Sequence, residues 1–389
     1  MAKYRFDQIA FNSTEKKKPV EEDRFTYLGL EHLDSGSLKV TRFGADVAPV
    51  GEKLVMHKGD VLFGKRRAYQ KKVAIAPFDG IFSAHGMVLR PKVEVIDPYF
   101  FPLFISSDYF LDAAIKISVG SLSPTINWRD LKILEFNLPD IETQRKLAAV
   151  LWSINDTMES YKKLISATDE LVKSQFIERF GLPGTDPYGW GLKTLGECCE
   201  LNPRRPQNMN ADVEYSFVAM PSVSDDGRVD ATITRPYKEV CKGFTYFAEN
   251  DVLFAKITPC MENGKGGVAK GLKNDAGFGS TEFHVLRPIE GISDPYWLYI
   301  ITMFKKFRSD AEKVMTGTGG QRRVPITYLN EYKIALPPIN HQKQFAAFVL
   351  QSDKSKYHIQ KSMTKCSEAV YEVRSILYPK CYLNRAKME

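Results

Sequence analysis

The sequence predicts an α+β protein with two globular domains, mixed but strand-rich and each with one or more helices, separated by two long helices packed as an antiparallel coiled coil. Three observations predict this fold. A set of landmarks recurs in the same order about 197 residues later. Within each copy, short β-branched and aromatic runs broken by Gly, Pro and Asn give way to a long stretch without Pro or Gly. That stretch carries a largely apolar stripe with alternating spacings of four and three, which is typical of a coiled-coil seam.

The internal repeat is visible as matching tetrapeptides. Asp60-Val-Leu-Phe63 matches Asp251-Val-Leu-Phe254, and Val88-Leu-Arg-Pro91 matches Val285-Leu-Arg-Pro288. The order continues in further matching pairs: Asp97-Pro98-Tyr99 with Asp294-Pro295-Tyr296, Leu138-Pro139 with Leu336-Pro337, and Gln144 with Gln342. The period is far longer than that of a solenoid repeat, so each copy is expected to be a domain. We expect the two domains to be related by a pseudo-twofold axis.

The breakers Gly181 and Pro379 set the ends of the two long helices. We expect a first globular domain over 1–139, a first long helix over 140–180, a linker over 181–189, a second globular domain over 190–337, a second long helix over 338–380 and a tail over 381–389. Each long helix would run about 60 Å at 1.5 Å per residue.

Inside the globular domains the sequence predicts mainly strands and loops, with strands at Val73–Ala76 and Ile81–Leu89 as examples. One helix is expected to interrupt the strands of each copy. Asp97 and Asp294 suit its N-cap, and the prolines that follow them suit its first position.

The coiled-coil seam is predicted residue by residue. In the first helix it consists of Leu147, Leu151, Ile154, Met158, Tyr161, Ile165, Thr168, Val172 and Gln175. In the second helix it consists of Phe345, Val349, Ser352, Lys356, Ile359, Met363, Cys366, Val370 and Val373, with Ser352 and Lys356 as weak points. A helix with one apolar stripe cannot bury that stripe alone, so the two helices are expected to pack on each other.

Composition and motifs narrow the function classes. The net charge of +7 and the pI near 8.9 fit a polyanionic partner, but only weakly. Met1–Ala10 is too polar for a signal peptide, no apolar run reaches the ~20 residues of a membrane span, and six cysteines form no C-x-x-C pair. We therefore expect a cytoplasmic protein with reduced thiols and no membrane contact.

No catalytic pattern withstands comparison between the two copies. Asp97-Pro-Tyr-Phe100 is one proline short of the Asp-Pro-Pro-Tyr motif of adenine methyltransferases, and its recurrence favours a helix start. No Walker-type loop is present, the histidines are scattered, and Gly264–Gly267 is expected in a loop poor in strands. We expect no catalytic residue, metal site or cofactor in this chain.

Polar loops in each copy suggest contact with DNA. The first pair of equivalent segments carries Lys65, Arg66, Arg67, Tyr69, Lys71 and Lys72 in one copy, and Lys256, Thr258, Asn263 and Lys265 in the other. The second pair carries Ser121, Ser123 and Asn127, and Thr318, Gln321, Arg322 and Arg323. Lys and Arg neutralise phosphates, whereas Arg reads guanine and Asn or Gln read adenine. A solvated charge run is the competing interpretation. The framework repeats while these loops diverge, as expected if the two domains read different sequences.

The chain resembles the specificity subunits of type I restriction–modification enzymes. The resemblance covers essentially the whole chain and rests on the two Asp-Val-Leu-Phe segments, two Leu-Pro-x-Ile-x-x-Gln helix starts and the long helix after each. It implies that each globular domain is a target recognition domain for one half of a split double-stranded DNA site. It also implies that the paired helices act as a spacer and as the platform for two methyltransferase subunits.

The resemblance places the chemistry in partner subunits. These would methylate adenine with S-adenosylmethionine and, with restriction and translocase subunits, cleave DNA using ATP and Mg²⁺. The seam from Leu147 to Gln175 would extend roughly 42 Å, enough to set two half-sites about one helical turn apart. Two alternatives stay open: a stand-alone nucleic-acid-binding scaffold and an enzyme with an unrecognised site.

Overall fold

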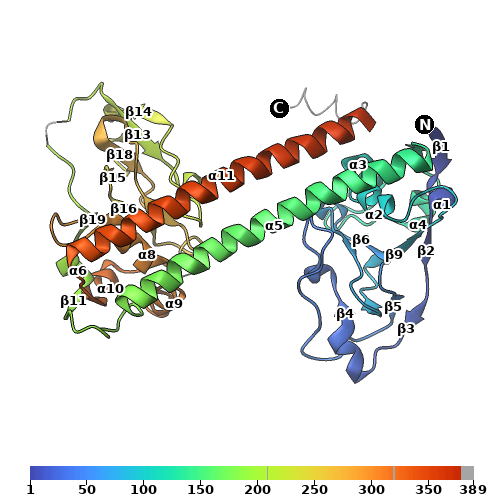
Figure 1. The fold of residues 1–389 in the computed structure, drawn as a ribbon, viewed down its shortest axis with the longest axis horizontal. Helices are drawn as coiled ribbons and strands as arrows, with labels where there is room; N and C mark the ends of the chain where they lie inside the picture. The colour runs from blue at the N-terminus through green and yellow to red at the C-terminus, as the bar shows by residue number, and fades with distance from the viewer. Residues whose placement is uncertain (208, 319, 378–389) are drawn as a thin grey trace. The chain divides into compact units, whose positions relative to one another are not determined.

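The computed structural model describes residues 1–207, 209–318 and 320–377, and its elements are drawn in Figure 1. The chain forms two compact units. Unit 1 holds Met1–Tyr161 with the described residues from Ser362 on, and unit 2 holds Lys162–Lys361. Each of the two long helices, α5 (Ile141–Phe180) and α11 (Ile339–Leu377), contributes one part to unit 1 and the other part to unit 2.

Unit 1 contains the blue and cyan elements of Figure 1. Its strands are β1 (Ala2–Arg5), β2 (Ala10–Ser13), β3 (Lys16–Lys17), β4 (Tyr27–Leu28), β5 (Lys53–Met56), β6 (Val61–Gly64), β7 (Val73–Ile75), β8 (Gly80–Phe82), β9 (Gly86–Pro91) and β10 (Glu135–Leu138). Its short helices are α1 (Phe6–Ile9), α2 (Phe100–Ile105), α3 (Asp108–Lys116), α4 (Trp128–Leu131) and the 3₁₀ turns η1 (Glu21–Thr26), η2 (Leu30–His32) and η3 (Ala68–Gln70).

Unit 2 has a similar but not identical order of elements. Its strands are β11 (Leu192–Thr194), β12 (Cys199–Leu201), β13 (Glu214–Val218), β14 (Thr234–Pro236), β15 (Thr245–Ala248), β16 (Val252–Ala255), β17 (Gly266–Val268), β18 (Ala276–Gly279), β19 (Phe283–Pro288) and β20 (Lys333–Ala335). Its short helices are α6 (Leu195–Cys198), α7 (Tyr237–Val240), α8 (Pro295–Met303), α9 (Lys305–Lys313), α10 (Ile326–Glu331) and the 3₁₀ turns η4 (Met220–Ser222) and η5 (Lys273–Asp275).

One four-stranded antiparallel sheet is the same in both units. It has the order β2-β9-β6-β7 in unit 1 and β12-β19-β16-β17 in unit 2. The register repeats as well, because Val61 pairs with Leu89 and Val252 pairs with Leu286. The two Asp-Val-Leu-Phe landmarks are therefore the central strands of equivalent sheets, and the predicted duplication is confirmed.

The second sheet of each unit shares only three strands. The shared part is β5-β8-β4 in unit 1 and β15-β18-β13 in unit 2, and in both it contains one parallel pair, β4 with β8 and β13 with β18. The fourth strand is added at opposite edges: β3 pairs with β5, whereas β14 pairs with β13. The duplicated domains thus differ in their strand arrangement as well as in their loops.

The two long helices pack antiparallel, as predicted. In unit 1, Leu151 near the start of α5 belongs to the same hydrophobic core as Val370 near the end of α11. In unit 2, Phe176 near the end of α5 lies 5.5 Å, between ring centroids, from Phe345 near the start of α11. Burial of one apolar stripe on each helix is the interaction that stabilises such a pair.

The structure differs from several local predictions. The one helix expected in each copy is two helices, α2 and α3 in unit 1 and α8 and α9 in unit 2. In unit 1 the first of them begins only at Phe100, although the Asp97 carboxylate accepts from the amides of Tyr99 and Phe100. In unit 2 the predicted helix start is confirmed, since Asp294 caps α8 and Pro295 is its first residue. The run over 81–89 is divided between β8 and β9 by a turn. The glycine-rich stretch at 264–267, expected in a loop, enters strand β17 at Gly266.

Candidate nucleic-acid interface

The two polar loops predicted in the first copy lie side by side in unit 1. The Ile126 amide donates to the Lys65 carbonyl at 2.9 Å, and the Arg67 amide donates to the Pro124 carbonyl at 2.8 Å. Arg66 extends this junction with a hydrogen bond from its Nε to Ser123 Oγ at 3.0 Å. Two segments about 60 residues apart in sequence therefore form one surface.

The basic residues of the first loop point in different directions. Arg66, Arg67 and Tyr69 are exposed, and Tyr69 is 56% exposed. Lys71 instead bonds to Asp108 Oδ1 at 2.7 Å and Asp112 Oδ1 at 2.8 Å. Lys72 donates to the Leu30 carbonyl at 2.6 Å, and Lys65 is half-buried. In the neighbouring loop Ser121 and Asn127 are exposed and Ser123 is partly so.

Three residues that the sequence did not single out complete a basic cluster in unit 1. His85, in the turn between β8 and β9, lies 3.3 Å from Arg66 through its Nε2. Burial lowers the pKa of His85, and so does the positive charge of Arg66, Lys65 and Lys53. Burial also lowers the pKa of Lys65, with a further contribution from Lys16. No sequence signal joins these residues, because they come from β3, β5 and a turn that only the two sheets bring together.

The same loop junction occurs in unit 2. The Val324 amide donates to the Lys256 carbonyl at 2.9 Å, which repeats the contact between Ile126 and Lys65. The Thr258 amide donates to the Arg322 carbonyl at 3.0 Å. Equivalent backbone contacts therefore place the two predicted loops of each copy beside each other.

The charged side chains of this second junction already have acidic partners. Arg323 forms a two-pronged ion pair with Glu282, with Nε to Oε2 at 2.9 Å and Nη2 to Oε1 at 2.7 Å. Arg322 lies 3.8 Å from Glu262 and 3.5 Å from Glu312. The hydrogen bonds from Arg323 lower the pKa of the Glu282 carboxyl, although the burial of Glu282 acts in the opposite direction.

The remaining predicted residues of unit 2 are divided between exposed and engaged positions. Asn263, Thr318 and Gln321 are exposed. Thr258 Oγ1 donates to Glu262 Oε1 at 2.7 Å, and Lys265 donates to the Met220 carbonyl at 3.2 Å. Lys256 is half-buried, and burial lowers its pKa.

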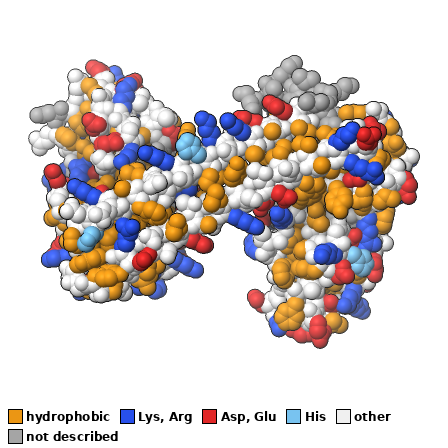
Figure 2. All heavy atoms as spheres, in the orientation of Figure 1, with side chains coloured by type: hydrophobic (Ala, Val, Ile, Leu, Met, Phe, Trp, Pro, Cys, Tyr) orange, Lys and Arg blue, Asp and Glu red, His pale blue; other side chains and the backbone are white. Residues whose placement is uncertain are grey.

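His85 and Glu282 precede equivalent strands, β9 and β19, and they account for the different charge of the two junctions. The residue beside Arg66 is a histidine among cations, whereas the residue beside Arg323 is a carboxylate. On the face drawn in Figure 2, Lys and Arg are interspersed with Asp and Glu over both units. Of the two loop junctions, that of unit 1 is the more basic.

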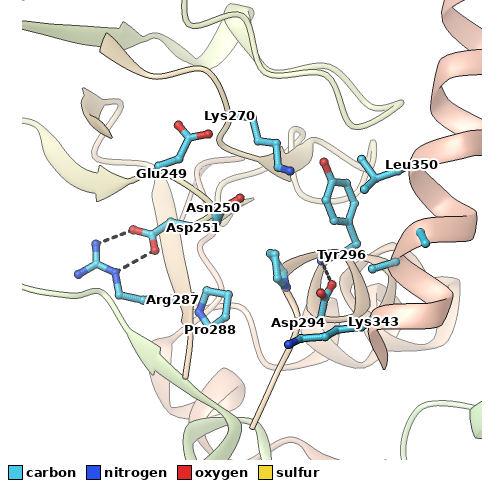
Figure 3. A pocket seen from close by; sticks show the side chains of 13 residues that line it. Glu249, Asn250, Asp251, Lys270, Arg287, Pro288, Asp294, Tyr296, Lys343 and Leu350 are labelled. Atoms are coloured by element: carbon cyan, nitrogen blue, oxygen red, sulfur yellow. Dashed lines mark hydrogen bonds and ion pairs between the residues drawn. The ribbon is translucent and has the colours of Figure 1, made fainter. Parts of the chain in front are cut away.

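An open pocket in unit 2 lies away from these loops. Figure 3 shows the bidentate pair of Asp251 and Arg287 on one side of it and Asp294, which caps α8, with Lys343 of α11 on another. Lys270 Nζ lies 4.9 Å from the centroid of the Tyr296 ring. No predicted DNA-binding residue lines this pocket, which is formed by the repeated framework.

Equivalent buried ion pairs hold that framework together. Asp60 and Arg90 in unit 1 form the same two-pronged pair as Asp251 and Arg287 in unit 2, with N–O distances of 2.7–2.9 Å. Each aspartate directly precedes the strand, β6 or β16, and each arginine lies in the Val-Leu-Arg-Pro landmark. The repeated tetrapeptides are therefore joined by an ion pair across neighbouring strands.

A buried glutamine fixes the start of each long helix. Gln144 Oε1 accepts from the Asp97 amide at 2.8 Å, and its Nε2 donates to the carbonyls of Val95 and Pro139. Gln342 repeats all three bonds with Asp294, Ile292 and Pro337. Both glutamines are 0% exposed. The glutamine of the Leu-Pro-x-Ile-x-x-Gln motif thus attaches the helix to its own domain.

The predicted seam residues are buried or partly buried on both helices. The weak point Lys356 is explained by ion pairs, since its Nζ lies 2.9 Å from Asp169 of α5 and 2.9 Å from Asp353. Although burial acts in the opposite direction, these two carboxylates raise the pKa of Lys356. Ser352 is buried at 7% exposure. The stripe therefore includes one charged contact between the helices.

Neither a membrane-spanning helix nor a metal-binding group occurs in the described residues. Within residues 1–207, 209–318 and 320–377, no helix is both long enough and apolar enough to cross a membrane. In the same part of the chain, no group of three or more His, Cys, Asp or Glu side chains is arranged to hold a metal ion.

Known proteins with similar sequences are specificity subunits. The chain is 40% identical over 158 residues to the type I restriction enzyme EcoEI specificity subunit and 39% identical over 160 residues to the EcoAI subunit, both from Escherichia coli. These matches cover 40% and 41% of this chain but 26% and 27% of the relatives. The matched part therefore spans about a quarter of the length of these relatives.

Two solved structures share the fold over nearly the whole chain. A type I restriction-modification system S subunit from M. genitalium has a TM-score of 0.53 at 15% identity, with 95% of this chain and 93% of that chain covered. A chain from a structure describing complex assembly and conformational transition of the type I R-M system has a TM-score of 0.52 at 19% identity, with 98% and 97% covered.

A family model matches the chain twice. The model describes the type I restriction modification DNA specificity domain, and it matches residues 35–167 and 187–365. The two matches fall on the two copies of the repeat and together cover most of the sequence. The chain therefore belongs to the type I restriction modification DNA specificity family.

Proposed function

We propose that this chain directs a type I restriction–modification complex to a bipartite double-stranded DNA site, with each unit reading one half. The observation that carries the proposal is the repeated loop junction. Equivalent backbone contacts place two polar loops together in each unit, while the side chains they present differ. A common scaffold with divergent polar loops is what recognition of two different sequences requires.

The two junctions suit different shares of DNA recognition. The exposed Arg66 and Arg67, with Lys16 and Lys53 nearby, supply positive charge that neutralises phosphates. In unit 2 the exposed Asn263 and Gln321 carry amides that can pair with adenine. Unit 1 would therefore contribute more to salt-dependent affinity than unit 2.

The proposed partners are two methyltransferase subunits and, through them, restriction and translocase subunits. The paired helices α5 and α11 would set the spacer between half-sites and dock the methyltransferases. S-adenosylmethionine, ATP and Mg²⁺ would be bound by those partners, which would methylate adenine and cleave DNA, and the chain itself would be non-catalytic. We place the complex in the cytoplasm, where the free thiols of the described cysteines would stay reduced.

Selection from a random pool of duplex DNA tests this proposal. The chain and its partner subunits are incubated with the pool, and both the bound and the methylated duplexes are sequenced. We expect two short defined half-sites separated by a spacer of fixed length, with methylation that requires the chain. A continuous motif would contradict reading by two units. Methyl transfer by the chain alone would contradict its non-catalytic role, and binding without any methyltransferase dependence would favour a stand-alone scaffold.

A further inference from the structure

In each unit, the loop that follows β6 or β16 is bonded to an equivalent helix, α3 or α9. In one unit the cation that makes the contact lies on the helix, and in the other it lies on the loop. In unit 2, Arg308 on α9 reaches the loop after β16. In unit 1, Lys71 on the loop after β6 reaches α3. The residue of α3 that corresponds to Arg308 is the buried Leu111, so the two contacts are not copies of one another.

Arg308 is a buried cation directed at loop carbonyls. Arg308 is 7% exposed, and its Nη1 and Nη2 donate to the carbonyls of Met261 and Gly264. Its guanidinium carbon lies 5.2 Å from the centroid of the Phe254 ring. Among the described residues, its Nε is buried without a hydrogen-bond partner and no carboxylate forms an ion pair with it. Burial lowers the pKa of Arg308 to about 10.

The two acceptors of Arg308 bracket the polar tip of the loop. Glu262 and Asn263 lie between Met261 and Gly264, and Asn263 is exposed. Glu262 in turn accepts from Thr258 Oγ1 and lies 3.8 Å from Arg322 of the neighbouring loop. A charged donor held in the core thus contacts the backbone on both sides of these polar side chains. Burying a charge without a carboxylate partner costs folding free energy, so packing alone does not explain this residue.

Lys71 holds the loop of unit 1 in an unusual backbone conformation. Its φ of 49° is left-handed, as is that of Arg67 at 54°, and these two residues flank η3 with the exposed Tyr69. Left-handed backbone is unfavourable for residues other than glycine. The two carboxylates of α3, Asp108 and Asp112, bind the Lys71 ammonium and offset that cost.

We propose that Arg308 and Lys71 are positioning residues for base recognition, each fixing the reading loop of one unit without touching DNA. The proposal rests on the proposed function, in which each unit reads one half-site. It assigns Lys71 a role different from a phosphate contact. Losing a phosphate contact weakens binding to all sequences alike, whereas a misplaced loop reduces the preference for one half-site.

The test compares matched variants of the complete complex in the random-pool selection. Arg308→Met keeps the length of the side chain and removes its donors, Arg308→Lys keeps a donor, and Lys71→Met removes the ion pairs. Lys306→Met and Lys116→Met are the controls, because they remove one exposed cation from the same two helices. Circular dichroism and thermal unfolding show which variants fold.

We expect Arg308→Met to lower base discrimination by about tenfold or more in one half-site and to leave the other half-site unchanged. Lys71→Met should do the converse, Arg308→Lys should restore part of the lost preference, and both controls should select the wild-type motif. If Arg308→Met does not fold, Lys71→Met and Arg308→Lys decide the matter.

Two outcomes would overturn the inference: a uniform loss of affinity with unchanged base preferences, or an equal loss of preference in both half-sites. Either outcome leaves the proposed function intact if the wild-type complex still selects a split motif. A wild-type complex that selects no split motif refutes the proposed function itself.

Discussion

His85 and Glu282 stand at equivalent places beside the two loop junctions and have different electrostatic effects. Arg66 faces a histidine surrounded by cations, whereas Arg323 is neutralised by a carboxylate in a two-pronged pair. A cation that already has a carboxylate partner releases less counterion on meeting a phosphate. The duplicated junctions should therefore respond differently to salt.

We expect Arg66→Gln to reduce the slope of log affinity against log salt by about 1. Arg323→Gln should reduce it by less, because Glu282 already compensates its charge. The measurement is fluorescence anisotropy of one labelled duplex with the complex over a salt series. Arg42→Gln, which removes an exposed arginine paired with Asp34, serves as the control. An equal reduction for Arg66→Gln and Arg323→Gln would show that Glu282 does not compensate.

His284 is a buried neutral histidine that joins β19 to the second reading loop. One ring nitrogen, Nε2, lies 2.8 Å from the Val324 carbonyl, and Nδ1 lies 3.2 Å from the Asn202 side-chain amide. A neutral ring donates from Nε2 and accepts at Nδ1, so both contacts are satisfied without a charge. Burial lowers the pKa of His284 from 6.5 to about 4.

This shift predicts a pH-dependent stability of unit 2. Between pH about 6.5 and about 4 the unfolded chain binds a proton that the folded chain does not, so the free energy of unfolding falls as the pH falls, by up to about 3 kcal/mol. We expect the difference between wild type and His284→Gln, measured by urea unfolding, to shrink as the pH is lowered from 7 to 4. His341→Gln, at an exposed position, should keep the wild-type dependence. A pH-independent difference for His284→Gln would argue against burial of a neutral ring.

At the scale of single elements, the first turn of each long helix depends on one glutamine. Gln144 and Gln342 each make three hydrogen bonds while fully buried. Their partners lie on the segment before α2 or α8 and on the proline before the long helix. In each unit, the side chain of this glutamine therefore bonds the first turn of the long helix to the backbone of its own domain.

We expect Gln342→Leu to lower the free energy of unfolding of unit 2 by about 2 kcal/mol or more, because the Asp294 amide and the Pro337 carbonyl lose a buried partner. Gln144→Leu should act likewise in unit 1. Urea unfolding monitored by circular dichroism measures the change, with the exposed Gln351→Leu as the control. A change below the experimental error would mean that the glutamines do not anchor the helices.

At the scale of the whole molecule, α5 and α11 each contribute to both units, and their seam repeats every seven residues. Removing one heptad keeps the apolar stripe in phase and shortens a helix by about 10 Å, close to three base pairs of B-DNA. The proposed role of the helices as a spacer therefore has a length dependence that can be measured.

We expect deletion of one heptad from both helices to shorten the spacer of the selected DNA motif while both half-site sequences stay the same. Sequencing of selected duplexes gives the spacer directly. Replacing exposed residues of the same heptads with alanine leaves the helix length unchanged and should leave the spacer unchanged. An unaltered spacer in the deletion variant would contradict the idea that helix length sets it.

The sequence alone determined the duplication, the antiparallel helices and the seam. These features are encoded locally, because a seven-residue period depends on neighbours one or two turns away, and repeated tetrapeptides such as Asp60-Val-Leu-Phe63 form the same strand wherever they recur. The start of α8 followed in the same way from Asp294 and Pro295. Even so, the equivalent helix of unit 1 begins only at Phe100, although the Asp97 carboxylate accepts from the equivalent two amides.

Only the tertiary structure decided which polar side chains are available to a ligand. Lys71 looked like a phosphate contact in sequence but binds two carboxylates of α3, and Arg323 looked free but binds Glu282. His85 lies near cations that are far from it in sequence, such as Lys53. The fourth strand of the second sheet lies at opposite edges of that sheet in the two units. Ion pairs and strand partners of this kind depend on segments tens of residues apart meeting in space. The path of the chain that brings them together is set by packing of the whole domain, which no local pattern contains.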